Sequence, residues 1–244
     1  MTSRYLRPSP PALLALGLFL LCTVLGGCGG TEASEQGVSV PGGRILAGPP
    51  EPVDTAQRYL FYLHGGIVEE QRVRPSHAQF GLYEYQKMLL RFADAGLWVI
   101  SESRPPKTDV AAYAGQVAEE VRALLAAGVP ADQITVVGFS KGGGIALLAA
   151  NLLQEKDVRF VILGACGDWL ERVPMEVTGQ FLSIYELSDD YGRSCRGVFA
   201  RGGPGLRFRE IRLALGRSHG VFYRALDDWL LPTQEWALGG PSAP

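Results

Sequence analysis

A serine set among glycines is the part of this chain best suited to covalent chemistry. In the stretch ITVVGFSKGGGIALLAANLL, residues 134–153, four residues typical of a buried strand precede Gly138, and a helix-forming apolar run completes it. Glycines two residues before and two residues after Ser140 remove side chains that would collide in a sharp strand-to-helix turn. Such a turn holds the serine hydroxyl at the positive end of a helix, which favours the oxyanion formed in acyl transfer.

Other side chains that could act with this serine also follow predicted strands. Strands alternate with helices along the chain, which predicts an α/β fold with a mostly parallel sheet covered on both faces. In such sheets ligands bind beyond the carboxyl ends of the strands. The residues expected there are, in chain order, His64-Gly65-Gly66, Ser101-Glu102, Ser140, Asp168, Asp189-Asp190 and His219. A serine, aspartates and a histidine in that order are typical of nucleophilic catalysis.

The segment 138–142, GFSKG, fits the G-x-S-x-G nucleophile elbow, and the chain resembles the α/β-hydrolase family over about residues 58–231. The resemblance implies an α/β-hydrolase fold with Ser140 as nucleophile and the Lys141 N–H as an oxyanion donor. The segment YLHGGIVEE resembles the family's oxyanion loop, which implies a second donor at Gly66 or Ile67. Lipases with an HGGG motif have glycine where this chain has Ile67, so their substrate preferences are not carried over.

Only three histidines could serve as the general base. His219 follows the last predicted strand and precedes the closing helix, where the resemblance places the base. His64 is expected to be a structural histidine that hydrogen-bonds the oxyanion loop. His77 lies in the polar loop RPSHAQFG and is expected to hold that loop or to face solvent.

The resemblance also implies an acid that orients the base, at about the position of Asp189 after the seventh strand. Asp190, Glu186 and Asp168 lie nearby and remain alternatives. Each of the three could instead form a salt bridge or cap a helix. Close to the oxyanion loop, a salt bridge is expected between Glu102 or Glu70 and an arginine such as Arg104 or Arg74.

The elements that must position these residues follow from periodicity. Strands are predicted at 58–64, 97–101, 158–164, 180–186 and 209–215, and helices at 83–96, from Asp109 to about Gly128, and at 221–231. Only about a dozen residues, 167–179, separate the sixth and seventh strands, so no helical lid or cap domain is expected and the site should be open and shallow. The region before Arg58 is too short for a full leading hairpin, which predicts a small, trimmed sheet.

The N-terminus is typical of a secretory signal peptide, residues 1–27. Two arginines precede an apolar run that is shorter than a membrane span of about 20 residues. A marginal transmembrane anchor is the alternative. The run ends in Leu-Gly-Gly-Cys, which resembles the lipobox of bacterial lipoproteins and implies lipidation of Cys28. Residues 28–55 are rich in Gly, Pro, Ser and acidic residues and are predicted to form a flexible tether, with one edge strand near Ile45. The hydrolase domain is then 56–244.

Cysteine usage adds one structural expectation. Removal of Cys22 with the signal peptide and lipidation of Cys28 leave Cys166 and Cys195, and an exported compartment permits a disulfide between them. The alternative is two unrelated buried cysteines that behave as small hydrophobic residues.

Composition narrows the possible functions further. The chain has 23 Lys+Arg against 25 Asp+Glu and a net charge of -2, which gives no basic face for nucleic acid. The sequence therefore predicts an exported, lipid-anchored serine hydrolase for small esters or thioesters, with no metal or organic cofactor implied. An acyltransferase with the same triad, or a non-catalytic binding lipoprotein on a hydrolase scaffold, are the alternatives.

Overall fold

The computed structural model describes residues 38–40, 43–72 and 74–240. The predicted signal peptide and the lipidation residue Cys28 lie outside these ranges. The strands are β1 (Val38–Val40), β2 (Gly43–Leu46), β3 (Tyr59–Leu63), β4 (Ser76–His77), β5 (Gly81–Leu82), β6 (Trp98–Ile100), β7 (Ile134–Phe139), β8 (Arg159–Leu163), β9 (Gln180–Glu186) and β10 (Arg207–Leu213). The helices are α1 (Gly66–Gln71), α2 (Tyr85–Asp94), α3 (Val110–Ala126), α4 (Lys141–Leu153), α5 (Asp168–Glu171), α6 (Arg196–Phe199) and α7 (Asp227–Ala237), with 3-10 helices η1 (Ala131–Gln133) and η2 (Ser218–Tyr223).

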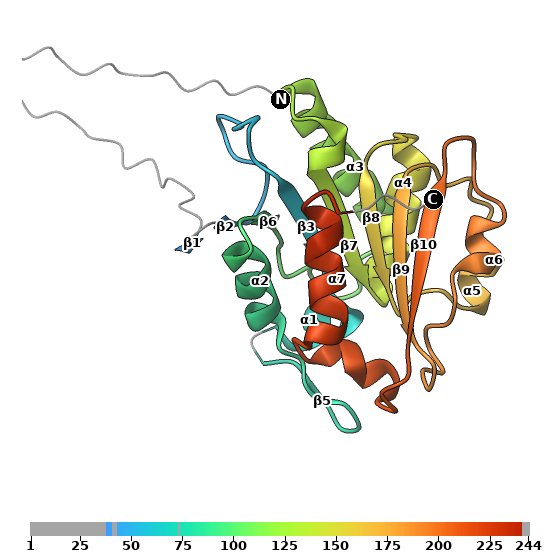
Figure 1. Ribbon diagram of the computed structural model, residues 1–244. Helices are drawn as coiled ribbons and strands as arrows, with labels where there is room; N and C mark the ends of the chain where they lie inside the picture. The colour runs from blue at the N-terminus through green and yellow to red at the C-terminus, as the bar shows by residue number, and fades with distance from the viewer. Residues whose placement is uncertain (1–37, 41–42, 73, 241–244) are drawn as a thin grey trace, which may run out of the picture. The chain divides into compact units, whose positions relative to one another are not determined.

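Eight strands form one sheet in the order β1-β2-β6-β3-β7-β8-β9-β10, and β4 and β5 form a separate hairpin (Figure 1). Every neighbouring pair from β2 to β10 is parallel, whereas β1 is antiparallel to β2. The predicted mostly parallel sheet is therefore confirmed. Parallel strands require crossover connections, and the helices between them supply these.

The register brings the carboxyl ends of the central strands to one edge. Leu63 of β3 pairs with Gly138 of β7, and Phe139 pairs with Leu163 of β8. Leu163 in turn pairs with Ile184 of β9. The loops that follow these strands must therefore meet, which is where ligand sites form in parallel sheets.

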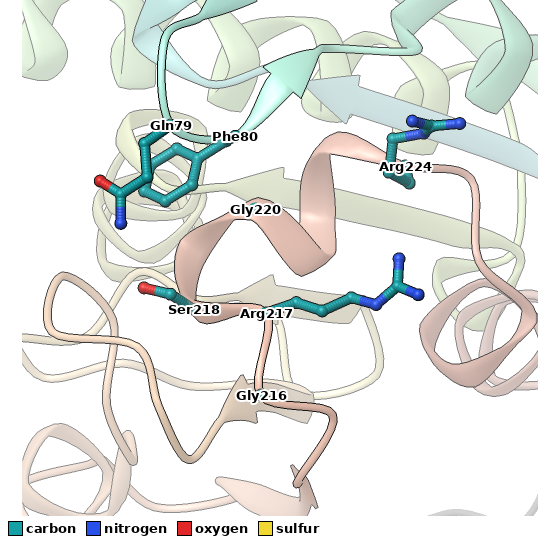
Figure 2. Close-up of a pocket in the computed structure, with 7 residues that line it drawn as sticks. All are labelled: Gln79, Phe80, Gly216, Arg217, Ser218, Gly220 and Arg224. Atoms are coloured by element: carbon teal, nitrogen blue, oxygen red, sulfur yellow. The ribbon is translucent and has the colours of Figure 1, made fainter.

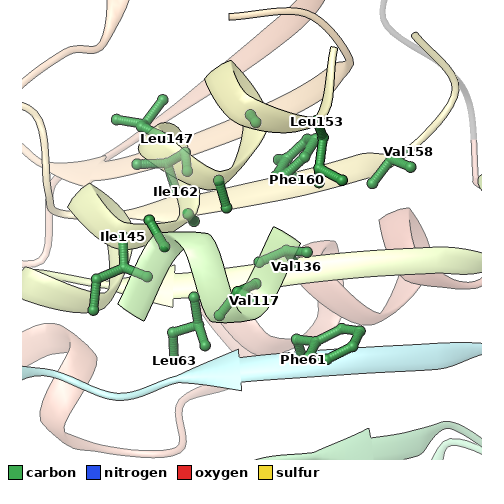
Figure 3. Packing of buried hydrophobic residues seen from close by; sticks show 14 of the residues in the cluster. Phe61, Leu63, Val117, Val136, Ile145, Leu147, Leu153, Val158, Phe160 and Ile162 are labelled. Carbon is green, nitrogen blue, oxygen red and sulfur yellow. The ribbon is translucent and has the colours of Figure 1, made fainter. Parts of the chain in front are cut away.

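Helices cover both faces of the sheet and bury its alternating side chains. Helices α3 and α4 pack on one face, where Phe61, Val136 and Ile162 lie against Val117 of α3 and Ile145 of α4 (Figure 3). Helices α2 and α7 cover the opposite face, with α7 in front of the sheet in Figure 1. The two apolar faces alternate along each strand because successive side chains point to opposite sides.

Helix α3 shows how local sequence sets an element boundary. Asp109 is the N-cap, and its carboxylate accepts a hydrogen bond from the Ala112 N–H at 2.8 Å. This satisfies one of the donors that a helix start leaves without an intrahelical partner. The helix ends at Ala126, just before Gly128, whose φ of +98° a side chain would disfavour.

Two expectations about the N-terminal part of the domain differ from the structure. Strand β2 is the strand expected near Ile45, but it is not at the edge of the sheet, because β1, also within the range predicted as a tether, pairs with it to form a short leading hairpin of an eight-stranded sheet. The prediction of a small, trimmed sheet is wrong for that reason. β1 and β2 together contain only seven residues. They form strands because β2 pairs with β6, which lies far along the chain, for example Ile45 with Val99.

The closing helix also differs from its prediction at 221–231. Residues 218–223 form the 3-10 helix η2, and α7 begins only at Asp227 and continues to Ala237. Pro232 lies inside α7, where proline lacks the N–H that would bond to the preceding turn. The side chains of Val221 and Phe222 are nevertheless buried against the sheet. The apolar pattern therefore predicted a buried segment correctly, but it did not predict that the segment begins as a 3-10 helix.

The connection between β8 and β9 contains only the four-residue helix α5, so the described residues hold no cap domain at this point of the chain. Among the described residues, no helix combines the length and the apolar character needed to cross a bilayer.

Candidate active site

Ser140 occupies a strained turn between β7 and α4. Its backbone angles are φ 53° and ψ −117°, a combination that costs a non-glycine residue of order 1–3 kcal/mol. A Cβ on Gly138 would lie 2.3 Å from the carbonyl oxygen of Gly142, and one on Gly142 would lie 1.9 Å from that of Leu63. Both glycines are therefore required by close backbone approach, as the sequence motif predicted. The turn leaves the Ser140 side chain partly exposed at the start of α4.

His219 and Asp189 come together from loops that follow different strands. His219 Nδ1 lies 2.7 Å from Asp189 Oδ2, and both residues are buried. The other carboxylate oxygen of Asp189 accepts a hydrogen bond from the Tyr191 N–H at 2.8 Å. Because both oxygens are held, the carboxylate can fix the orientation of the imidazole ring and direct Nε2 away from Asp189.

The His219 ring lies beside the serine turn. Its centroid is 4.8 Å from that of Phe139, the residue that precedes Ser140. The rings of Tyr191 and Phe80 flank it at 5.3 and 6.1 Å. Within the described residues no hydrogen bond joins the Ser140 hydroxyl to His219, which is common for catalytic pairs before a substrate is bound.

The three alternative acids have other partners or surroundings. Asp190 is exposed, although it adjoins Asp189 in sequence. Asp168 is also exposed and forms an ion pair with Arg193 at 2.7 Å. Glu186 is buried, and its carboxylate accepts hydrogen bonds from the backbone N–H groups of the loop after β10, including Leu215 at 2.9 Å. The structure thus places only Asp189, among the four carboxylates, on the His219 ring.

The predicted oxyanion loop lies against the serine turn. A Cβ on Gly65 would be 3.7 Å from Cβ of Ser140 and 2.9 Å from the Phe139 ring. Gly66 and Ile67 are the first residues of α1, and Lys141 is the first residue of α4. N–H groups in the first turn of a helix have no intrahelical acceptor, so those of all three residues are free to bond a ligand.

His64 has a structural part, as the sequence suggested. The Arg104 N–H donates to its Nε2 at 3.0 Å, which makes Nε2 an acceptor. The proton of the neutral ring is then on Nδ1, which donates to the Gly65 carbonyl at 2.8 Å. Burial, together with the nearby Arg104 charge, lowers the pKa of His64 to about 3. His64 is therefore neutral at ordinary pH and braces the oxyanion loop.

A buried carboxylate links the oxyanion loop to the serine turn. Glu69 of α1 forms ion pairs with Arg104 at 3.0 Å and with Lys141 at 2.6 Å. The Arg104 guanidinium also donates to the carbonyl oxygen of His64. The sequence-based expectation named Arg104 correctly but chose the wrong carboxylates, because Glu70 is exposed and Glu102 instead accepts a hydrogen bond from the Tyr113 hydroxyl.

A disulfide joins the loops that follow β8 and β9. Cys166 and Cys195 are bonded, with their Cα atoms 5.1 Å apart. The Arg193 N–H also donates to the Cys166 carbonyl at 2.7 Å. Since Asp189 lies in the same loop as Cys195, the bridge restrains the segment that carries this carboxylate.

The β4–β5 hairpin contributes side chains that sequence reasoning passed over. His77 stacks on Phe80 with ring centroids 4.6 Å apart, and its Nδ1 accepts a hydrogen bond from the Gln79 N–H. His77 thus holds its loop, as expected, while Phe80 forms part of the wall beside His219. Phe80 and Tyr191 were not identified from the sequence, since neither belongs to a motif, and Glu69 was not singled out within the oxyanion-loop segment YLHGGIVEE. Within the described ranges, no group of three or more His, Cys, Asp or Glu side chains is arranged to hold a metal ion.

Comparisons with known proteins bear on the fold and on the family that part of the chain resembles. Residues 98–178, which contain the Ser140 turn, match the family described as Phospholipase/Carboxylesterase. The chain is similar to the solved structure of SOBER1 from Arabidopsis thaliana, with 12% sequence identity and a TM-score of 0.50 over 75% of this chain and 98% of that one. It is similar to ATU1826 from Agrobacterium tumefaciens, a candidate α/β hydrolase of unknown function, with 15% identity and a TM-score of 0.50 over 75% and 85% of the two chains.

No curated protein sequence matches the chain. The structural likenesses show that the fold is the α/β-hydrolase fold, as predicted. The match to the phospholipase/carboxylesterase family covers residues 98–178, about a third of the chain.

Proposed function

We propose that this chain, an α/β hydrolase of the phospholipase/carboxylesterase type, is an exported serine hydrolase that cleaves small esters or thioesters through an acyl-enzyme on Ser140. The observation that carries the proposal is the Asp189-bound His219 ring, packed on Phe139 beside the strained Ser140 turn. A nucleophile, a base and a group that orients the base are the parts that this chemistry needs.

In the first half of the reaction, Ser140 Oγ attacks the ester carbonyl carbon and transfers its proton to His219 Nε2. Asp189 stabilises the imidazolium that forms, because its carboxylate is already bound to Nδ1. The oxyanion of the tetrahedral intermediate accepts hydrogen bonds from the N–H groups of Lys141 and of Gly66 or Ile67. The bond to the leaving oxygen or sulfur then breaks, and His219 returns the proton to the leaving group.

In the second half, water enters the same position and His219 removes its proton. The resulting hydroxide attacks the acyl-enzyme, the bond to Ser140 Oγ breaks, and the serine recovers its proton from His219. The carboxylic acid product leaves the site. No residue is consumed and no cofactor takes part in this cycle.

The substrate class follows from what surrounds the site. The connection between β8 and β9 carries only the short helix α5, so this connection does not supply an inserted domain that could enclose a long channel above Ser140. The Phe139, Tyr191 and Phe80 rings lie around His219. An open site with aromatic walls is better suited to a small ester than to a long acyl chain.

The Ser140→Ala variant tests the proposal with a small ester panel and a fluorophosphonate probe. The wild-type protein should be labelled and should hydrolyse at least one ester, whereas the variant should fold normally and lose activity by a factor of about 10⁴. The turnover of Ser140→Ala at near wild-type rates would exclude this mechanism.

The same experiment separates the two alternative functions. A non-catalytic binding lipoprotein would not be labelled by the probe. An acyltransferase would be labelled but would hydrolyse slowly, and it would turn over faster when an alcohol or amine acceptor is added. We favour hydrolysis because the connection between β8 and β9 carries only the short helix α5, which leaves the site open to water.

The location of the protein is a separate part of the proposal, because it depends on residues 1–28. We infer that the signal peptide is removed and that lipid on Cys28 anchors the domain, facing the periplasm or the cell exterior. Cys28→Ala should then release the domain from membranes or block its processing. A wild-type mature protein that is soluble and begins after Cys28 would contradict the anchor without affecting the chemistry at Ser140.

A further inference from the structure

A cavity lies on the segment that carries His219, although His219 itself does not line it. Its volume is about 390 Å³, and seven residues line it (Figure 2). Ser218 and Gly220, the chain neighbours of His219 on either side, belong to its wall, and Phe80 of the β4–β5 hairpin forms another part. The volume falls within the roughly 300–1,000 Å³ of small-molecule sites.

The charge in this cavity is positive. Its lining includes Arg217 and Arg224 and no acidic residue. In Figure 2 both arginine side chains extend to the same side of η2, opposite to Gln79 and to the Ser218 hydroxyl. Arg224 shares its charge with Glu84 through an ion pair of 3.0 Å.

Arg217 differs from Arg224 in its partners. Its guanidinium forms no ion pair or hydrogen bond with the part of the chain that the structure describes, and its side chain is exposed. Two acids close to it in the chain or the fold have other partners, since Asp189 bonds to His219 and Glu186 accepts hydrogen bonds from the Leu215 and Gly216 N–H groups, two and one residues before Arg217. The five N–H donors of Arg217 are therefore available to a ligand.

The position of the cavity identifies the half of an ester that would occupy it. His219 Nδ1 is bound to Asp189, so Nε2 must take the proton from Ser140 and return it to the leaving oxygen. The leaving group must pass next to the His219 ring for that transfer. Phe80 connects the cavity to this path, because its ring lines the cavity and its centroid lies 6.1 Å from that of His219, so a leaving group at the imidazole can reach the cavity past Phe80.

We infer that this cavity binds the alcohol part of the substrate and that Arg217 recognises an anionic group, a carboxylate or a phosphate, carried by that alcohol. The inference rests on the proposed ester hydrolysis and makes its substrate class more specific. A guanidinium matches both anions because its planar fork donates two parallel hydrogen bonds to a pair of oxygens. Because Glu84 partly neutralises the charge of Arg224, Arg217 is the main determinant of specificity for the anionic group.

Matched pairs of esters test this specificity. The first pair, 4-acetoxybenzoate and 4-acetoxybenzamide, differs only in the charge of the leaving phenol. The second pair, 2-acetoxyethyl phosphate and 2-acetoxyethanol, asks whether phosphate replaces carboxylate. Monophenyl succinate and phenyl butyrate place the same charge on the acyl side instead. In each pair the measured quantity is the ratio of kcat/KM for the anionic ester to that for the neutral ester.

For at least one leaving-group pair, this ratio should fall by about tenfold in Arg217→Ala, a factor typical of a charge-assisted hydrogen bond at a partly exposed site. Arg217→Lys should recover part of the ratio, and Arg217→Glu should lower it further. Arg212→Ala, which removes an exposed arginine that does not line the cavity, should leave the ratio unchanged. An unchanged ratio in Arg217→Ala, an equal fall in Arg212→Ala, or a fall confined to the acyl-side pair would overturn the inference.

A binding measurement separates this inference from the proposed function. 4-Hydroxybenzoate, the product of the first pair, and ethylene glycol monophosphate should bind Ser140→Ala in calorimetry, at least one of them about tenfold more weakly when Arg217→Ala is added. If the protein is not labelled by fluorophosphonate yet this Arg217-dependent binding remains, the hydrolase proposal fails and the anion site stands. Binding that does not depend on Arg217 would remove the site whatever the activity.

Discussion

Glu69 Oε2 lies 2.6 Å from Nζ of Lys141, so the helix of the oxyanion loop is tied to the residue that follows the proposed nucleophile. The same carboxylate holds Arg104 through its other oxygen, and the Glu69 and Arg104 side chains are only 4% and 1% exposed. Two cations around one buried acid form a network whose members depend on one another, because a buried charge without a partner is costly.

Glu69→Gln should therefore destabilise the fold by about 3–5 kcal/mol, since Arg104 would lose its buried counter-charge. Urea unfolding followed by circular dichroism measures this free energy. Glu70→Gln is the matched control, because Glu70 is adjacent and exposed, and its change should stay within about 0.5 kcal/mol. Equal losses in the two variants would show that the network contributes little.

Asp189→Asn should leave the fold intact and lower turnover by up to about 10⁴, because an amide favours the wrong tautomer of His219. Asp190→Asn is the control, since its exposed carboxylate lies next to Asp189 in sequence but not on the imidazole. Steady-state kinetics on one small ester compares the two variants. A larger loss in Asp190→Asn would move the proposed acid to that residue.

Loss of the Cys166–Cys195 disulfide should lower the free energy of unfolding by about 3 to 4 kcal/mol, from the chain entropy of a closed loop of this length. The sequence separation is 29 residues. Denaturant unfolding of the Cys166→Ala, Cys195→Ala double variant gives the value. Because the bridge restrains the loop of Asp189, kcat should fall as well, whereas an unchanged kcat would mean that the hydrogen bonds of that loop suffice.

His64 predicts a pH dependence of stability. Its pKa falls from the ordinary 6.5 to about 3 in the folded chain. Between these values the unfolded state binds the extra proton, so stability is complete above pH 6.5 and decreases as the pH falls toward 3. The contribution lost between pH 7 and pH 5 is about 2 kcal/mol.

This loss is measured as the difference in unfolding free energy at the two pH values. His64→Gln should show a smaller difference, because a glutamine amide can offer an acceptor and a donor but does not titrate. The comparison uses the difference between pH values, so a lower absolute stability of the variant does not affect it. The same pH dependence in both proteins would exclude His64 as its source.

The Ser140 turn could be predicted from local sequence. Two glycines, a preceding strand and a following apolar run are all within twenty residues. The steric exclusion at Gly138 comes from the nearby Gly142 backbone, whereas that at Gly142 comes from Leu63 of β3 and exists only in the folded sheet. The alternation of strands and helices could also be predicted from the sequence, because a strand that is buried on both faces of a parallel sheet consists of a run of apolar residues. The disulfide could also be predicted, because Cys166 and Cys195 are the only cysteines left in the sequence once Cys22 and Cys28 are assigned to the N-terminal segment.

Only the tertiary structure decided between Asp189 and Asp190, or between Glu69 and Glu70. The members of each pair are the same residue type at adjacent positions, so the sequence does not distinguish them. Their side chains nevertheless point in different directions. Which one meets His219 or Arg104 depends on the path of loops that start 30 or 35 residues away in the chain. The pairing of β2 with β6 and the cavity beside His219 have the same origin, since both are made by segments that meet only after the sheet has formed.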